Sequence, residues 1–261
     1  MWMPQCVTRR ANRLDSLPTR LVGVNTKTYL SLADSRRWLE QLAERSDLLA
    51  AAGLFVAVPP PVLPDARALL GGTGIAWAAQ NTWTGRGPCT GEVGTSMLAE
   101  LGCTFVIAGH SERRKAFGED DASTASKAAS IAANAMVPVI CVGETGYGDL
   151  TMAADHVEAQ AARILAAVPD TAPVVIAYTP VWAAGAADAA NHDHVQTILR
   201  RLAPLRQARR GAIRFMYGGA CRPGTFTALA GGEGHLDGVF TARSGLDVTQ
   251  LACIAAELTD G

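Results

Sequence analysis

The stretch LVGVNTKTYL, residues 21–30, begins with an apolar run and continues through the polar residues Asn25 and Lys27. A short, continuously apolar run predicts a strand that is buried on both faces, as in a parallel sheet. An open, doubly wound sheet usually has a Gly-rich GxGxxG turn directly after its first strand, and this stretch contains none. It therefore favours a closed barrel over an open sheet.

Seven further apolar runs follow, and amphipathic, helix-like stretches separate them. The runs span residues 54–60, 75–81, 105–110, 137–143, 173–180, 213–219 and 236–243. In one of the intervening stretches, residues 35–52, the residues Trp38, Leu39 and Leu42 fall near one helical face. Eight such repeats in a chain of 261 residues, with no break in composition, predict an α/β protein with a single (β/α)₈ barrel over residues 21–261.

Residues 1–20, MWMPQCVTRRANRLDSLPTR, precede the first run and contain several arginines. They lack the apolar core of a secretory signal. We expect a disordered N-terminal extension, or a start codon assigned too far upstream, in preference to a transit peptide.

Composition excludes several classes of protein. The formal net charge of −1 provides no basic field for nucleic acid, and no apolar run approaches the length of a membrane span. The cysteines are scattered without a CxxC pair, which favours a reducing compartment, and we expect the cytoplasm. The sequence NHDH at residues 191–194 is interpreted as a polar helix start, so neither a metal nor a cofactor is expected.

In a barrel of this kind, function lies at the carboxyl ends of the strands. The polar and small residues expected there are Asn25, Lys27, Gln80, Asn81, His110, Glu144, Thr179, residues 217–220, Ala242 and Arg243. Gly-rich loops follow the last two strands, where barrels often hold a phosphate through backbone N–H groups. The sequence therefore predicts a small phosphorylated substrate.

Several stretches together resemble the triosephosphate isomerase family, in the family's order, from about Leu21 to the end of the chain. The most specific is FVIAGHSERRKAFGEDD at residues 105–121; others are CTGEVGTSMLAELG at 89–102, AYTPVWAAG at 177–185 and MYGGA at 216–220. The resemblance implies isomerisation between an aldose phosphate and a ketose phosphate through an enediolate, as in glycolysis and gluconeogenesis. Such a reaction needs a base, an electrophile and donors for the phosphate and the oxyanion.

The resemblance assigns four catalytic roles. Lys27 matches the family's electrostatic lysine and Asn25 the amide beside it. The alternative for Lys27 is a solvated surface lysine, and its place at the end of the first strand favours the site. His110 matches the family's electrophile; the alternative is an ordinary histidine at the end of a strand. Glu112 matches a carboxylate that supports the lysine, and it also suits the start of a helix, where negative charge is favoured.

The resemblance also assigns substrate-binding residues. Gly185 matches the phosphate-binding end of a hinged lid; the alternative is that it is an ordinary glycine in a turn. The remaining matches lie in the loops after the seventh and eighth strands: Gly218, Gly219, Ala220, Ala242 and Arg243. Thr90 matches the tip of a loop that completes the partner's site, which implies a homodimer.

One position departs from the family in a way that concerns chemistry. The family's general base is a glutamate in AYEPVW, and this chain has Thr179 there. A threonine hydroxyl is not a useful base near pH 7, and it is about two bonds shorter in reach. Loss of a general base commonly costs roughly 10²–10⁴-fold in rate. We therefore expect very weak or absent isomerase activity, the condition of a pseudoenzyme.

Smaller departures leave two alternatives open. Ala220 lacks the family's usual serine hydroxyl, and Ala242 and Arg243 replace its Gly-Gly pair; Arg243 could bind phosphate in a bidentate pair. A branch that resembles erythrulose-phosphate isomerases also tends towards arginine there, so an active isomerase on another sugar phosphate is one alternative. A non-catalytic, sugar-phosphate-binding or regulatory protein is the other. No other residue suits the role of a substitute base: Tyr178 is expected to point to the opposite side of its strand, Glu144 to support loop packing, and Asp188 to lie beyond the lid.

Overall fold

Eight parallel strands close into one barrel, in which each strand pairs with its neighbours in chain order and β8 pairs with β1. The computed structural model describes residues 17–259. The strands are β1 (Leu21–Asn25), β2 (Leu54–Val58), β3 (Ala76–Ala79), β4 (Phe105–Ala108), β5 (Val137–Val142), β6 (Val174–Tyr178), β7 (Ile213–Tyr217) and β8 (Gly238–Thr241). The predicted (β/α)₈ barrel is confirmed.

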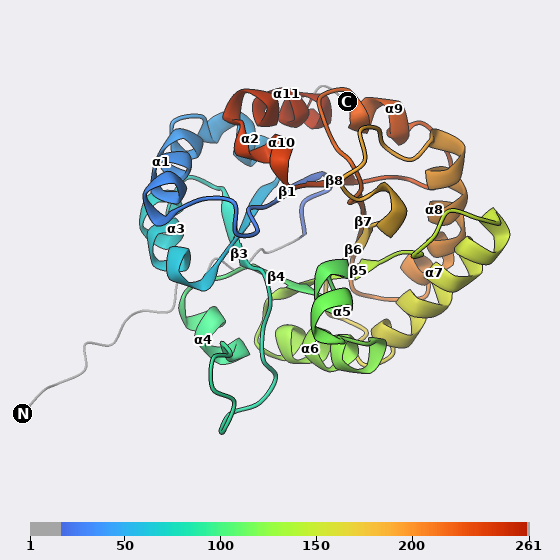
Figure 1. Cartoon of the computed structure of the whole chain (residues 1–261), viewed down its shortest axis with the longest axis horizontal. Coiled ribbons are helices and arrows are strands. Elements are labelled where there is room, and N and C mark those ends of the chain that lie inside the picture. Colours follow the sequence, from blue (N-terminus) through green and yellow to red (C-terminus); the bar gives the residue numbers. More distant parts are fainter. Residues whose placement is uncertain (1–16, 260–261) are drawn as a thin grey trace, which may run out of the picture.

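Helices surround this ring of strands on the outside (Figure 1). They are α1 (Leu32–Ala43), α2 (Ser46–Ala51), α3 (Leu63–Leu70), α4 (Thr95–Glu100), α5 (Ser111–Phe117), α6 (Asp121–Ala133), α7 (Leu150–Leu165), α8 (His192–Gln207), α9 (Thr225–Ala230), α10 (Arg243–Leu246) and α11 (Val248–Thr259), with 3₁₀ turns η1 (Pro60–Val62) and η2 (Val181–Ala183). No helix among residues 17–259 combines the length and apolarity needed to cross a membrane.

The core has two layers because successive side chains of a strand point to opposite faces of the sheet. Inside the barrel, Phe55 stacks on Phe105 and on Phe240, with ring centroids 4.5 Å and 5.8 Å away. Outside, side chains such as Val22 and Tyr178 pack between the strands and the helices. Tyr178 therefore lies on the far side of its strand from the barrel interior, as its position next to Thr179 predicts.

Each strand ends one or two residues before the end of its predicted apolar run, and this difference shapes the functional end of the barrel. β1 stops at Asn25 because Lys27 takes a left-handed conformation with φ of 48°, which cannot continue a strand. β3 likewise stops at Ala79, before Gln80 and Asn81. The polar residues at the ends of the predicted runs thus belong to loops.

The packed domain begins before its predicted boundary at residue 21. Leu17 is 6% exposed and joins the cluster inside the barrel. Arg214 Nε and Nη2 donate to the carbonyls of Pro18 and Leu17, at 2.7 Å and 3.2 Å. Assignment of residues 17–20 to the extension was therefore wrong, because these contacts are made across the fold. The rest of the expected disordered extension, residues 1–16, lies outside the described residues.

Candidate active site

A cavity of about 640 Å³ lies at the carboxyl ends of the strands. The structure brings all eleven residues that the family resemblance assigned to the site into its lining, and they come from the carboxyl ends of five strands and the segments that follow them. They are Asn25, Lys27, His110, Glu112, Thr179, Gly185, Gly218, Gly219, Ala220, Ala242 and Arg243. In the described part of the chain, no group of three His, Cys, Asp or Glu side chains is arranged to hold a metal ion.

Lys27 and Asn25 are held together by the turn after β1. The backbone N–H of Lys27 donates to Asn25 Oδ1 at 2.9 Å, and Gln80 Nε2 donates to the Lys27 carbonyl at 3.0 Å. The Lys27 ammonium donates to Glu112 Oε1 at 2.5 Å. The turn thus directs one cation and one amide into the cavity, and the cation is paired with a carboxylate from α5.

His110 caps the N-terminus of α5, and this role determines its tautomer. Its Nδ1 accepts a hydrogen bond from the backbone N–H of Glu112 at 3.3 Å, so the ring proton of the neutral form is on Nε2. Burial lowers the pKa of His110; Glu112 acts to raise it and Lys27 to lower it, and the net direction is downward. The ring is therefore a neutral hydrogen-bond donor near pH 7.

We predict that the His110 ring titrates below the ordinary histidine value of 6.5. Because the folded state disfavours its protonated form, the contribution of His110 to stability is present above pH 6.5 and decreases as the pH falls below it. Imidazole ¹⁵N shifts recorded across a pH series check this. His192 is the internal control, since its bonds to the Gly231 carbonyl and to Asp193 raise its pKa. A His110 pKa at or above 6.5 would contradict the neutral-donor assignment.

Thr179 follows β6 directly and is buried at the cavity wall. Its backbone N–H donates to the Val142 carbonyl at 2.7 Å, and its hydroxyl donates to the Ala177 carbonyl at 3.3 Å. A Cβ atom built on Gly218 would lie only 2.4 Å from Thr179 Oγ1. The side chain is thus closely packed against the next loop and presents a neutral hydroxyl, not a charge.

The segment after Thr179 is anchored from outside the barrel. Glu144 Oε1 accepts from Trp182 Nε1 at 2.7 Å and from the Tyr178 hydroxyl at 3.0 Å, and His194 Nε2 lies 3.1 Å from the same oxygen. Neither Glu144 nor Tyr178 lines the cavity among the described residues. Glu144 therefore supports the packing of this segment, as expected from the sequence.

Gly185 and the loops after β7 and β8 form the other end of the cavity. Gly185 has φ of 81°, and a Cβ there would lie 3.9 Å from Arg243 Nη2. A Cβ on Gly219 would lie 2.1 Å from the Tyr217 hydroxyl, which itself accepts from the Ala190 N–H at 2.8 Å. Glycine at 219 therefore leaves room for the Tyr217 hydroxyl, and Gly185 lies beside the exposed residue Arg243.

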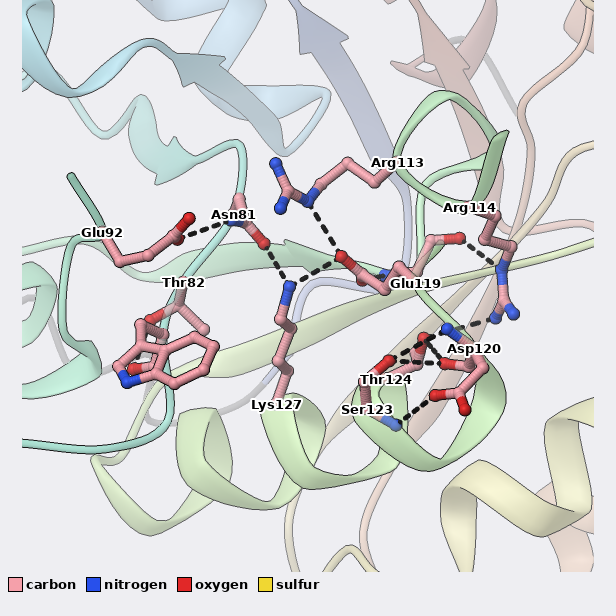
Figure 2. Close-up of polar contacts among 12 residues, drawn as sticks. Asn81, Thr82, Glu92, Arg113, Arg114, Glu119, Asp120, Ser123, Thr124 and Lys127 are labelled. Atoms are coloured by element: carbon pink, nitrogen blue, oxygen red, sulfur yellow. Dashed lines mark hydrogen bonds and ion pairs between the residues drawn. The ribbon is translucent and has the colours of Figure 1, made fainter. Parts of the chain in front are cut away.

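A buried ionic network behind the site was not predicted (Figure 2). Glu119 Oε2 accepts from Lys127 Nζ at 2.6 Å and from Arg113 Nε at 2.8 Å, while Glu119 Oε1 accepts from the Gly109 N–H at 2.9 Å. Lys127 also donates to Asn81 Oδ1 at 2.7 Å. The network secures the backbone next to His110. The sequence FGEDD contains Glu119, but nothing in it distinguishes a buried glutamate from a surface one.

Two expectations about the site need correction. Gln80 and Asn81 do not line the cavity: Gln80 bonds to backbone and to Thr26 beneath the first loop, and Asn81 joins Lys127. Conversely, several lining residues were missed, and they are Tyr29, Ser111, Lys115, Cys221, Arg222, Ser244 and Gln250. They lie three to nine residues beyond a strand end, where the course of the following loop or helix decides which side chains reach the cavity.

Comparison with known proteins agrees with this geometry. A family model described as triosephosphate isomerase matches residues 20–258. A triosephosphate isomerase of Cupriavidus taiwanensis is 40% identical over 215 residues, with 78% of this chain and 85% of the relative covered. An L-erythrulose-1-phosphate isomerase of Pectobacterium atrosepticum is 33% identical over 247 residues, with 90% and 94% covered. The chain belongs to the triosephosphate isomerase family.

Proposed function

We propose that the cavity binds a small sugar phosphate and is an aldose–ketose isomerase site in which Thr179 has replaced the general base. Turnover of glyceraldehyde 3-phosphate and dihydroxyacetone phosphate is then very weak or absent. One observation carries the proposal: a neutral, packed hydroxyl stands at the cavity wall where β6 ends. A hydroxyl cannot remove a proton from carbon near pH 7.

The other acid at the cavity does not substitute for the missing base. Of the lining residues in the described chain, Glu112 alone carries a carboxylate. Its Oε1 is paired with the Lys27 ammonium at 2.5 Å, and its Oε2 lies 3.6 Å from His110 Nδ1. A carboxylate paired with Lys27 in this way stabilises the cation, and it is not available to remove a proton from a substrate.

The remaining polar groups suit an enediolate. His110 Nε2–H can polarise a carbonyl as a neutral donor, which is the scheme of the family. Lys27 adds a cation and Asn25 adds an amide donor. Both would stabilise the negative charge that develops on the oxyanion. These groups bind a sugar phosphate whether or not the proton transfer follows.

At the far end, Gly185, Gly218, Gly219, Ala220 and Ala242 offer backbone to a phosphate, and Arg243 adds a side-chain cation. We expect Arg243→Gln to weaken binding of glycerol 3-phosphate by roughly 10- to 100-fold, since charge-assisted hydrogen bonds contribute about 1.5–3 kcal/mol. Isothermal titration calorimetry checks this. Arg37→Gln, on the exposed face of α1, is the control and should leave the affinity unchanged. Equal affinities for both variants would remove Arg243 from the site.

A second candidate is an active isomerase on a four-carbon sugar phosphate. Arg243 at the cavity and the relative named L-erythrulose-1-phosphate isomerase favour it. It requires a base other than Thr179.

A third candidate function is that of a non-catalytic binding or regulatory protein. For such a protein we expect a ligand to stabilise the fold without being turned over.

The deciding experiment measures turnover and ligand stabilisation together. Triose and tetrose phosphates are offered as substrates, and the thermal midpoint is recorded with and without glycerol 3-phosphate. Stabilisation without turnover supports the base-less site. Turnover of a tetrose phosphate supports the second candidate and overturns the role given to Thr179. No stabilisation by glycerol 3-phosphate rejects a sugar-phosphate site.

We also propose a cytoplasmic homodimer. Thr90 is exposed in the segment between β3 and α4, which extends away from the barrel (Figure 1). That shape suits insertion into a second subunit. Analytical ultracentrifugation of the chain and of Thr90→Arg tests it: a dimer that the variant converts to monomer supports the proposal.

A further inference from the structure

Glu144 is a buried acid outside the cavity, and its charge is incompletely compensated. Its Oε1 accepts hydrogen bonds from Trp182 Nε1 at 2.7 Å and from the Tyr178 hydroxyl at 3.0 Å. Its Oε2 has no hydrogen-bond partner among the described residues. Burying an ionised carboxylate is costly unless a cation lies close to it. Within residues 17–259, the one group within 4.0 Å of this carboxylate that can become positive is the ring of His194.

The contacts of His194 determine where its protons lie. Its Nε2 is 3.1 Å from Glu144 Oε1 and 3.1 Å from the Tyr178 hydroxyl oxygen. The hydroxyl already donates its proton to Glu144, and a carboxylate has no proton to donate, so both oxygens can only accept. The neutral ring therefore carries its proton on Nε2. Its Nδ1 has no hydrogen-bond partner in the described part of the chain, so a second proton can bind there without breaking a bond.

A second proton on this ring supplies the positive charge that Glu144 lacks. Charge-assisted hydrogen bonds are shorter than neutral ones and roughly twice as strong. The side chains of His194 and Glu144 are only 5% and 7% exposed, so water and salt screen their attraction little. Histidine is the side chain that ordinarily changes charge between about pH 5 and 8. A fall in pH through this range should therefore strengthen the contact between the two residues.

The contact holds together the two ends of the segment that joins β6 to α8. Trp182 lies in η2, at the start of this segment, and His194 lies in the first turn of α8, just after it. Both side chains meet the same oxygen, Glu144 Oε1. Their rings also pack edge to face, with centroids 5.3 Å apart. Residues 183–193, which include Gly185 over the cavity, are thus closed at their base by one carboxylate.

Three tyrosines and two groups of its own helix are the other titratable neighbours of this histidine. Tyr147 is largely exposed and stacks on its ring, with centroids 6.0 Å apart. Tyr178 contacts it directly, and Tyr217 lies behind Tyr178; burial raises the pKa of both hydroxyls, so they remain neutral below pH 8. His192 and Asp193 are exposed and contact each other at 3.2 Å. The charge that a proton on the ring meets is therefore that of the buried carboxylate.

We propose that Glu144 and His194 form a proton-dependent clasp on the segment that carries Gly185. When the ring gains its second proton, the clasp tightens, Trp182 is held more firmly and the segment becomes less mobile. When the ring is neutral, the same contacts persist as weaker hydrogen bonds and the segment moves more freely. The clasp requires neither a bound ligand nor turnover, so it is independent of the proposed function.

The test follows both ends of the clasp by NMR in the ligand-free protein, from about pH 8 to pH 5. We expect the indole ¹H–¹⁵N resonance of Trp182 to shift along the same titration curve as the imidazole nitrogens of His194, because both side chains bond to Glu144 Oε1. The amide of Gly185 should show less slow exchange in ¹⁵N relaxation dispersion at pH 5 than at pH 8. A Trp182→Phe protein assigns the indole resonance.

Two glutamine variants separate the charge of the ring from its hydrogen bond. His194→Gln keeps an N–H donor that cannot become charged, so the pH-dependent shift of Trp182 and the pH dependence at Gly185 should both disappear. His156→Gln, at an exposed position of α7, is the matched control and should retain both. Thermal midpoints show whether the variants fold, and the joint titration in the parent decides the matter without them. A Trp182 resonance that does not move with pH in the parent, or that moves equally in His194→Gln, would overturn the inference.

Discussion

Replacing Thr179 with glutamate is expected to raise the rate of glyceraldehyde 3-phosphate isomerisation by roughly 10²–10⁴-fold, the usual contribution of a positioned general base. Thr179 lines the cavity together with His110 and Lys27, so the electrophile and the cation are already in place. The added side chain supplies the two bonds of reach and the carboxylate that the hydroxyl lacks. A coupled assay that follows dihydroxyacetone phosphate measures the gain.

The matched control is Thr179→Gln, which has the same reach but cannot accept the proton, and it should show no gain. In the glutamate variant, the rate should fall at low pH as the new carboxylate becomes protonated. A folded Thr179→Glu protein with no gain would show that the departures at Ala220 and Arg243 also disable the site. A parent already as fast as the variant would show that another group takes the proton.

The largest expected effect on stability is that of Glu119→Gln. Glu119 and Lys127 have side chains only 4% and 8% exposed, and Arg113 shares the same carboxylate (Figure 2). Removing one partner of a buried ion pair leaves an uncompensated buried charge and costs about 3–5 kcal/mol. Urea denaturation monitored by circular dichroism measures the free energy of unfolding. The variant should also loosen the Gly109 backbone next to His110, since Glu119 holds its N–H.

Glu40→Gln is the control for this stability measurement. Glu40 is about half exposed and pairs with Arg36 on α1 at 3.2 Å, and exposed pairs of this kind contribute less than about 1 kcal/mol. A Glu119→Gln protein as stable as Glu40→Gln would show that the amide satisfies Lys127 and Arg113 as well as the carboxylate does.

The same network predicts a dependence of stability on pH. Burial acts to raise the pKa of Glu119, but hydrogen bonds from Lys127 and Arg113 outweigh it and hold the pKa below the ordinary value of 4.5. The stabilisation is therefore present above pH 4.5 and is lost as the pH falls through the folded-state pKa. The parent should lose stability more steeply than Glu119→Gln when the pH is lowered below 4.5. Parallel pH profiles for the two proteins would assign the acid sensitivity to other groups.

The sequence by itself predicted the class of fold and the end of the barrel that carries the site. Strands of a parallel sheet are buried on both faces, so they appear as short apolar runs, and there are eight of them. Their carboxyl ends share one side of the sheet, so residues as distant as Lys27 and Arg243 were expected to lie together. These inferences depend on local apolarity and chain order, which a sequence records directly.

Only the tertiary structure decided which side chains pair and which are charged. Lys27 meets Glu112 across 85 positions of sequence because closure of the barrel brings the loops after β1 and β4 together. Asn81 turns away from the cavity to Lys127, 46 positions later. The neutral state of His110 and the low pKa of Glu119 arise from burial and from partners supplied by other elements. Such electrostatic properties depend on distances in space, and distances in space are not encoded in the order of residues.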